Sequence, residues 1–151
     1  MASANLQPEQ EGWQPRIVAF LCTWCSYAGA DLAGVSRLQY PPNVRVIRVP
    51  CSGRVDPAFI VKALEEGADG ILVSGCHIGD CHYGEGNFRA RRRFKYLYDL
   101  LTYMGIEPER LNFTWISAAE GGKFAETIAK VTERVRSVGP AEKLVKASWT
   151  L

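Results

Sequence analysis

Cysteines are the residues of this sequence most able to carry out chemistry. Cys22 and Cys25 form a C-x-x-C pair. Cys76 and Cys81 form a C-x4-C pair, and Cys51 stands between the two pairs. Thiolates are nucleophiles and ligands of soft metals. Their number, five, is odd, and residues 1–14 lack the apolar stretch of a secretory signal. These features argue against a disulfide scaffold and for metal or redox chemistry.

The composition is that of one soluble globular domain. The chain has 151 residues, 47% of them hydrophobic and 23% charged, which fits a single domain with a core of its own. The net charge of +2 gives no reason to expect a nucleic-acid partner. No apolar run approaches the ~20 residues that span a membrane. We therefore expect a cytoplasmic protein without a membrane span.

Three regions differ in composition. Residues 1–15 are rich in Gln, Glu and Pro and predict a flexible arm. Residues 16–139 carry the pattern of a folded domain, and residues 140–151 form a tail. Trp149 and Leu151 indicate that this tail either docks onto another surface or is a disordered end.

Strand-like and helix-like segments alternate within the domain. Apolar runs predict strands over residues 17–21 and 70–74, and two further strands are predicted over residues 44–49, where Arg45 and Arg48 stand between apolar residues, and 111–116. Helical spacing predicts helices over 27–38, from Asp56-Pro57 to Gly67, along the stripe from Phe94 to Met104, and from Phe124 onward. This alternation is typical of a parallel sheet covered on both faces. We expect an α/β fold, a small three-layer flavodoxin-like or Rossmann-like domain with a four-stranded parallel sheet of order 2-1-3-4.

All five cysteines fall at the carboxyl ends of the first three predicted strands. Cys22 and Cys25 follow the first strand, Cys51 the second, and Cys76 and Cys81 the third. In the expected strand order these three strands are neighbours, and ligands bind such sheets at their carboxyl edge. The thiols should therefore converge on one site.

Four thiolates suit either tetrahedral zinc or an iron–sulfur cluster. The surroundings favour a cluster, because two helices begin near the site and turn the positive ends of their dipoles toward it. Glycines of the third loop leave backbone N–H groups free to approach the sulfurs, and aromatic rings shield the site from water. The glycines are Gly75, Gly79, Gly84 and Gly86, and the rings are those of Trp24, Tyr27 and Tyr83.

Two other interpretations of the cysteines stay open. Cys22 and Cys25 could form the dithiol of a thiol–disulfide oxidoreductase. Alternatively, zinc could stabilise a scaffold that only bridges other proteins of a complex. His77 and His82 each follow a cysteine directly. We expect them to donate hydrogen bonds to a cluster or a partner rather than to bind metal.

A basic segment opens the third predicted helix. Positive charge at a helix N-terminus opposes the helix dipole, so an acidic group should stabilise it. Asn87 is the expected N-cap of this helix. The segment is either a solvated face or a docking site for an acidic partner, and Arg54 and Arg91 could offset the charge of a cluster. Its members are Arg89, Arg91, Arg92, Arg93 and Lys95.

The cysteine segments together resemble one family. Phe20-Leu-Cys-Thr-Trp-Cys-Ser-Tyr27, Val49-Pro-Cys-Ser-Gly-Arg-Val55 and Gly75-Cys-His-Ile-Gly-Asp-Cys-His-Tyr-Gly-Glu-Gly-Asn87 are similar to segments of the delta subunit of the methyl-viologen-reducing (F420-non-reducing) hydrogenase. The resemblance covers residues 16–138. It implies one 2Fe–2S cluster held by four of the five cysteines, with Cys22 and Cys76 expected among the ligands. His77, His82, Trp24, Gly75 and Gly79 are then expected to surround it.

The resemblance also implies a role. The family carries electrons, in methanogens and some anaerobic bacteria, between a hydrogenase or another oxidoreductase and the flavin-bearing subunit of heterodisulfide reductase. The residues agree with a non-catalytic carrier, because they contain no convincing acid–base or nucleophile–base pair. Neither G-x-G-x-x-G after a strand nor a P-loop is present, so we expect no bound nucleotide.

Overall fold

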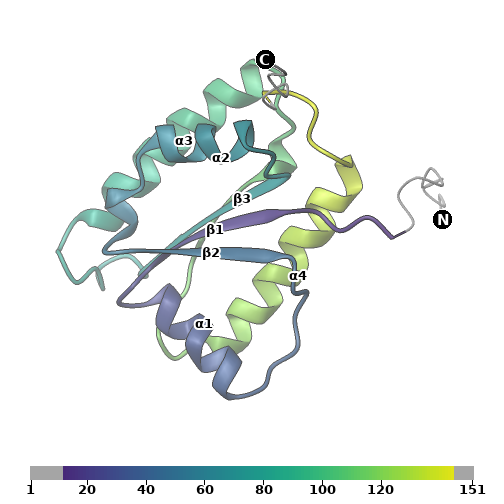
Figure 1. The fold of residues 1–151 in the computed structure, drawn as a ribbon. Coiled ribbons are helices and arrows are strands. Elements are labelled where there is room, and N and C mark those ends of the chain that lie inside the picture. Colours follow the sequence, from purple (N-terminus) through teal and green to yellow (C-terminus); the bar gives the residue numbers. More distant parts are fainter. Residues whose placement is uncertain (1–11, 145–151) are drawn as a thin grey trace, which may run out of the picture.

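The structure, a computed structural model, describes residues 12–144 and is built on a four-stranded sheet (Figure 1). All strands are parallel and their order is β2-β1-β3-β4, which confirms the expected topology. The elements are β1 (Ile17–Cys22), α1 (Ser26–Val35), β2 (Val44–Val49), η2 (Ser52–Arg54), α2 (Pro57–Glu65), β3 (Gly70–Gly75), α3 (Gly86–Tyr103), η3 (Pro108–Arg110), β4 (Leu111–Trp115) and α4 (Gly121–Val138).

Helices cover both faces of the sheet, with α2 and α3 on one face and α1 and α4 on the other (Figure 1). The two faces separate because successive side chains of a strand point in opposite directions. Phe20 of β1 packs in the α2–α3 core, whereas its neighbours Ala19 and Leu21 pack in the α1–α4 core. The site-bearing strands β1 and β3 are therefore almost entirely buried.

Local sequence explains where helix α2 begins and ends. The Asp56 carboxylate accepts a hydrogen bond from the Ala58 N–H at 2.8 Å, and Pro57 occupies the first turn, where it needs no backbone donor. Gly67 has φ +99°, the left-handed conformation that commonly follows a helix. Both expectations about this helix are confirmed.

Several predicted boundaries differ from the structure. Helix α1 ends at Val35 rather than at residue 38, because Arg37 takes the left-handed conformation with φ 56°. Met104 follows the end of α3 and is 54% exposed, so it does not extend the buried stripe of that helix. The N-cap of α3 is Glu85 and not Asn87, which lies inside the first turn with its side chain buried.

A hydrogen-bonded clasp joins both ends of the described domain at the amino edge of the sheet. The buried Asp69 carboxylate accepts from the Arg16 N–H at 2.8 Å and from the Ala141 N–H at 3.0 Å. The guanidinium of Arg110, also buried, donates to the carbonyls of Asp69 and Pro140. The boundaries expected at residues 15 and 139 stay predictions, and Trp149 and Leu151 lie outside the described residues. Within residues 12–144, no helix is long and apolar enough to cross a membrane.

Candidate metal centre

All five cysteines lie at the carboxyl edge of the sheet, as the topology requires. Cys22 is the last residue of β1, and Cys25 is the N-cap of α1. Cys51 follows β2 as the N-cap of η2, while Cys76 and Cys81 lie in the loop after β3. All are free thiols; Cys81 is half-buried and the other four are buried. The sequence therefore predicted the edge correctly.

The thiols form two groups at this edge. Cys22, Cys25 and Cys76 form a trio whose sulfurs all lie within 4.8 Å of one another. Within it, the sulfurs of Cys22 and Cys76 are 3.8 Å apart. Cys51 and Cys81 form a separate pair, also with their sulfurs 3.8 Å apart. Burial is the main cause that raises the pKa of Cys51, and the charge of Cys22 raises it slightly further, which links the two groups electrostatically.

Gly86 leaves room for the Cys51–Cys81 pair. A Cβ at Gly86 would stand 2.2 Å from the Cys51 sulfur and 3.2 Å from the Cys81 sulfur, so no side chain fits there. Gly75 plays a different part, because a Cβ there would meet the Ser52 side chain instead. A Cβ at Gly79 or Gly84 would meet nothing within 4 Å. Among the four glycines expected to approach the sulfurs, the close contact therefore belongs to Gly86.

Hydrogen bonds among the thiols, together with burial, shift the pKa values of the trio. A hydrogen bond with the Cys25 thiol lowers the pKa of Cys22 to about 5, against the opposing effect of burial. The same hydrogen bond, helped by burial, raises the pKa of Cys25. Burial raises the pKa of Cys76. These shifts favour the charged form at Cys22 over that at Cys25 and Cys76.

In the pair, burial raises the pKa of one thiol and backbone hydrogen bonds lower the pKa of the other. Burial raises the pKa of Cys51 to about 11, although the Gly53 N–H donates to its sulfur at 3.4 Å. Burial acts on Cys81 in the same direction, but backbone N–H groups of Tyr83, Asn87 and Gly86 outweigh it and lower the pKa. Two of these donors lie in the first turn of α3, where the helix dipole also favours negative charge.

Aromatic side chains from two loops form an outer layer near the thiols. The Trp24 and His82 rings stack with centroids 3.7 Å apart. The Trp24 indole N–H donates to the Tyr83 hydroxyl at 3.1 Å, and the His82 and Tyr83 rings meet edge to face. The contacts join the C-x-x-C turn to the C-x4-C loop. Tyr27 is placed elsewhere, with the Arg48 guanidinium over its ring.

The His77 side chain contacts a carboxylate of the same chain, that of Glu120. Its Nε2 lies 2.6 Å from a Glu120 carboxylate oxygen. That carboxylate also accepts from the Ser117 N–H, and these contacts lower the pKa of Glu120 to about 2. The contact ties the loop after β3 to the start of α4, across 43 residues of sequence.

Sequence reasoning missed the role of three polar side chains that hold the thiol loops. The buried Asn87 amide donates to the carbonyls of Cys76 and His77, at 3.1 and 2.9 Å. The Ser26 and Ser74 hydroxyls, both buried, are 2.8 Å apart and link α1 to β3. Asn87 carries no sequence signal that separates this role from helix capping. For Ser74, the signal was a polar residue inside an apolar strand.

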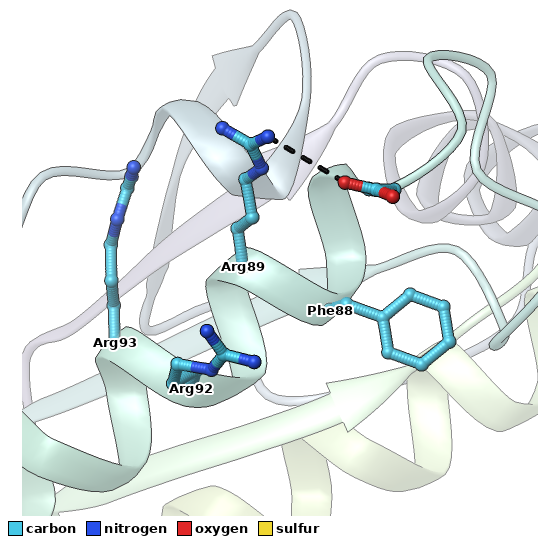
Figure 2. Close-up of a pocket in the computed structure, with 5 residues that line it drawn as sticks. Phe88, Arg89, Arg92 and Arg93 are labelled. Atoms are coloured by element: carbon cyan, nitrogen blue, oxygen red, sulfur yellow. Dashed lines mark ion pairs between the residues drawn. The ribbon is translucent and has the colours of Figure 1, made fainter.

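The basic segment is exposed, and its members differ in their contacts. Arg89 pairs with Glu85, the acidic group expected near the helix start, and Arg93 donates to the Gly53 carbonyl. Among the described residues, Arg91 and Arg92 have no ion-pair partner. Figure 2 shows Arg89, Arg92 and Arg93 projecting from successive turns of α3 around one hollow.

Comparison with known proteins assigns the family. The profile of the methyl-viologen-reducing hydrogenase delta subunit family matches residues 17–139, which span the whole sheet and all four α-helices. The chain belongs to this family. The delta-subunit match contains all five cysteines, so the shared region includes both thiol groups.

Curated relatives fall into two kinds. The chain is 58% identical over 130 residues to an iron–sulfur subunit of the F420-non-reducing hydrogenase of Archaeoglobus profundus, covering 86% of this chain and 95% of that protein. It is 54% identical to the corresponding vhc iron–sulfur subunit of Methanococcus voltae, covering 86% and 90%. It is also 48% identical over 136 residues to one subunit of the ferredoxin:CoB-CoM heterodisulfide reductase of Methanosarcina mazei, covering 90% of this chain but 17% of that longer protein.

The thiols of this chain fit an iron–sulfur group. A tetrahedral metal with metal–sulfur distances of ~2.3 Å, as for zinc, holds two ligand sulfurs ~3.8 Å apart. The Cys22–Cys76 and Cys51–Cys81 sulfur distances, both 3.8 Å, match this separation. Soft thiolate donors and the space left at Gly86 agree with the "iron-sulfur" names of the relatives.

Proposed function

We propose that this chain is a non-catalytic electron-transfer subunit that carries one 2Fe–2S cluster at the carboxyl edge of its sheet. The observation that carries the proposal is the presence of two thiol pairs with equal sulfur separations of 3.8 Å. A 2Fe–2S cluster takes four cysteine ligands. The ligands would be Cys22 and Cys76 from one pair and Cys51 and Cys81 from the other. Bound there, the cluster supplies reversible one-electron redox chemistry.

Cys25 is the cysteine left outside this ligand set. The Cys25 sulfur belongs to the trio, but it also lies 3.6 Å from the Ser26 hydroxyl. Cys25 itself is the N-cap residue of α1. Removing it leaves both 3.8 Å pairs complete. In this proposal Cys25 is a buried neighbour that packs beside the ligands.

The chain's own groups tune the site. Burial of Cys22, Cys51 and Cys76 keeps water away from the sulfurs. Helices α1 and α3 both begin at the edge that holds the thiols, so their positive ends favour an anionic group. Backbone N–H groups at the start of α3 face the Cys81 sulfur. Hydrogen bonds to sulfur and low solvent exposure are the features that set the potential of such centres.

The relatives support a position between two oxidoreductases. Several are named hydrogenase iron–sulfur subunits, and in Methanosarcina mazei a homologous segment is part of a heterodisulfide reductase polypeptide. A domain that is fused to such a polypeptide in a relative is expected to work beside one when separate. We propose that the chain relays electrons between a hydrogenase or another oxidoreductase module and the flavin-bearing subunit of a heterodisulfide-reductase-type complex, in the cytoplasm of an anaerobe.

Metal analysis of anaerobically purified protein tests the cofactor. The proposal expects iron and acid-labile sulfide in equal amounts, a reddish-brown absorption, and a paramagnetic signal after one-electron reduction. A colourless protein with stoichiometric zinc would overturn it and favour the zinc scaffold.

Single cysteine-to-serine variants test the ligand set. Cys25→Ser should retain iron near the wild-type level, because both 3.8 Å pairs remain. Cys22→Ser, Cys51→Ser, Cys76→Ser and Cys81→Ser should each lose at least half of it, measured as iron per chain. Loss of iron in Cys25→Ser together with retention in one of the others would show that the assignment is wrong.

A thiol–disulfide oxidoreductase is the second candidate, favoured by one observation. The pKa of Cys22 is lowered to about 5 beside Cys25, as in a reactive C-x-x-C dithiol. This candidate expects an iron-free protein that forms a reversible disulfide between Cys22 and Cys25. Iron in the purified protein and a Cys25→Ser variant that still accepts electrons would exclude it.

A further inference from the structure

Two buried hydroxyl groups and one thiol connect the core of the domain to the thiol trio. The Ser74 hydroxyl of β3 lies 2.8 Å from the Ser26 hydroxyl at the start of α1, and the Ser26 hydroxyl lies 3.6 Å from the Cys25 sulfur. The Cys25 sulfur lies within 4.8 Å of the Cys22 and Cys76 sulfurs. All three groups are buried. We call Ser74, Ser26 and Cys25 the hydroxyl–thiol network.

The hydrogens of this network can point in either direction. Each member carries one hydrogen and can also accept one. If Ser74 donates to Ser26 and Ser26 donates to Cys25, the Cys25 S–H is left to donate to a sulfur of the trio. In the opposite direction, Cys25 donates to Ser26 and no hydrogen of the network faces the other sulfurs. The Ile116 carbonyl oxygen competes for the Ser26 hydrogen, but at a longer distance of 3.4 Å.

The charge of the trio decides between the two directions. As metal ligands, Cys22 and Cys76 are thiolates. Cys25 lies outside the ligand set and keeps its proton, because a further buried anion beside two others is unfavourable. A charged acceptor forms a stronger hydrogen bond than a neutral hydroxyl, so the network points its hydrogens toward the thiolates. Cys25 shares a hydrogen bond with Cys22, and hydrogen bonds in series strengthen one another.

We propose that Cys25 is a positioning residue that donates its S–H to the Cys22 ligand sulfur and thereby raises the reduction potential of the bound centre. This inference rests on the proposed function, because it takes Cys22 as a ligand and Cys25 as a free thiol. Reduction adds negative charge to the centre, so a donor at a ligand sulfur stabilises the reduced state more than the oxidised state. The proton stays on the Cys25 sulfur throughout.

Two substitutions at Cys25 separate hydrogen bonding from packing. Cys25→Ser keeps a donor, whereas Cys25→Ala removes it. The full chain is purified anaerobically, and its midpoint potential is measured by redox titration of the paramagnetic signal. We expect Cys25→Ala to retain iron and to be at least threefold harder to reduce, which is about 28 mV at ~59 mV per tenfold change for one electron. Cys25→Ser should lie closer to wild type than to Cys25→Ala.

Thr132→Val is the matched control for these variants. It removes a buried hydroxyl of α4 that contacts Asn43, the residue before β2, away from the thiols. This variant should keep the wild-type iron content and midpoint potential.

The S–H group itself provides a second readout. Infrared spectroscopy of the iron-loaded wild type should show one S–H stretching band, because the other four cysteines bind iron, and Cys25→Ser should lack this band. Ser74→Ala frees the Ser26 oxygen to accept the Cys25 hydrogen. The band should therefore shift in Ser74→Ala, and the potential should fall by less than in Cys25→Ala. A residue that only fills space would change neither.

Several results would overturn the inference. They are a wild-type potential in iron-loaded Cys25→Ala, an iron-loaded wild type without an S–H band, and loss of iron from both Cys25 variants, which would make Cys25 a ligand. If Cys25→Ala alone loses iron, Ser74→Ala decides, and a wild-type potential and S–H band in that variant would refute the proposed hydrogen bond. Iron content separates the two hypotheses, because a wild-type chain without iron contradicts the proposed function and this inference with it.

Discussion

At the scale of single residues, the site depends on Gly86, because a side chain at this position would occupy the space of two thiols. Gly86 begins α3 and allows its backbone to approach the Cys51 and Cys81 sulfurs. The same position brings the first N–H groups of the helix toward the Cys81 sulfur, where they stabilise its thiolate. Space and hydrogen bonding at one thiol pair therefore have a common origin in the start of one helix.

Replacing Gly86 by alanine should disrupt the metal centre. A Cβ 2.2 Å from the Cys51 sulfur forces either the thiol or the start of α3 to move. We expect Gly86→Ala to retain less than half of the wild-type iron per chain, measured after anaerobic purification. The control is Gly122→Ala in α4, where a Cβ meets nothing within 4 Å. Wild-type iron content in Gly86→Ala would mean that the Cys51–Cys81 pair is not part of the centre.

Of all features of the site, the roles of single residues were the hardest to predict from the sequence. The cysteines and Gly86 could be named from composition and position, since few other groups bind soft metals. Asn87 could not, because its amide acts through carbonyls of the third loop, ten and eleven residues away. His77 was expected to face a cluster or a partner. Its contact with Glu120 depends on how β3 and α4 are brought together, which no local pattern encodes.

At the scale of elements, α1 is positioned by close backbone contact. A Cβ at Gly29 would lie 2.8 Å from the Ser117 carbonyl oxygen, and one at Gly121 would lie 3.0 Å from the Ala33 nitrogen. Helix α1 therefore packs tightly against the start of α4. Because Cys25 caps α1 and Cys22 lies three residues earlier, this packing also fixes the C-x-x-C turn.

Two glycines of α1 offer a matched test of that packing. Gly29→Ala should lower the free energy of unfolding by about 1–3 kcal/mol, because the added methyl group overpacks the contact with Ser117. Gly34→Ala lies in the same helix and meets nothing within 4 Å, so it should be neutral or stabilise by up to ~1 kcal/mol. Urea denaturation of both variants measures the difference. Equal stabilities would show that α1 moves freely to accept a side chain.

Topology could be predicted because β1 and the centre of β3 are short apolar runs and because α2, α3 and α4 have regular apolar stripes. Parallel connection then places the cysteine loops at one edge without further information. The division into a trio and a pair could not be predicted. It depends on the path of residues 77–85 and on the directions of individual thiols, and sequence spacing constrains neither. Helix ends were missed where Arg37 adopts a left-handed conformation that glycine more often supplies.

At the scale of the whole molecule, acid stability should depend on the tie between β3 and α4. The Ser117 N–H and His77 lower the pKa of Glu120 to about 2, below the ~4.3 expected in an unfolded chain. A carboxylate of this kind stabilises the fold above its unfolded pKa, and the contribution is lost as pH falls toward 2.

Glu120→Gln should therefore be less stable than wild type at pH 7 and should lose less stability between pH 5 and pH 3. Urea midpoints at these pH values measure both effects. Both proteins are compared after metal removal, so that the difference between their midpoints reports on the carboxylate and not on acid release of metal. The control is Glu133→Gln, whose carboxylate pairs with Arg136 on the surface of α4. The prediction would be contradicted if the difference in urea midpoint between Glu120→Gln and wild type stayed constant from pH 5 to pH 3.

The Asp69 clasp makes the domain suitable as an insertable module. Asp69 holds the backbone of residues 16 and 141 together at the edge of the sheet opposite the thiols. Extra polypeptide joined at these two points would enter and leave side by side, without passing over the site. The Methanosarcina mazei relative, where such a segment takes up 17% of a longer protein, is an arrangement this geometry permits. The same property would let an engineer anchor the domain to an electrode by its clasped edge while its redox edge faces solution.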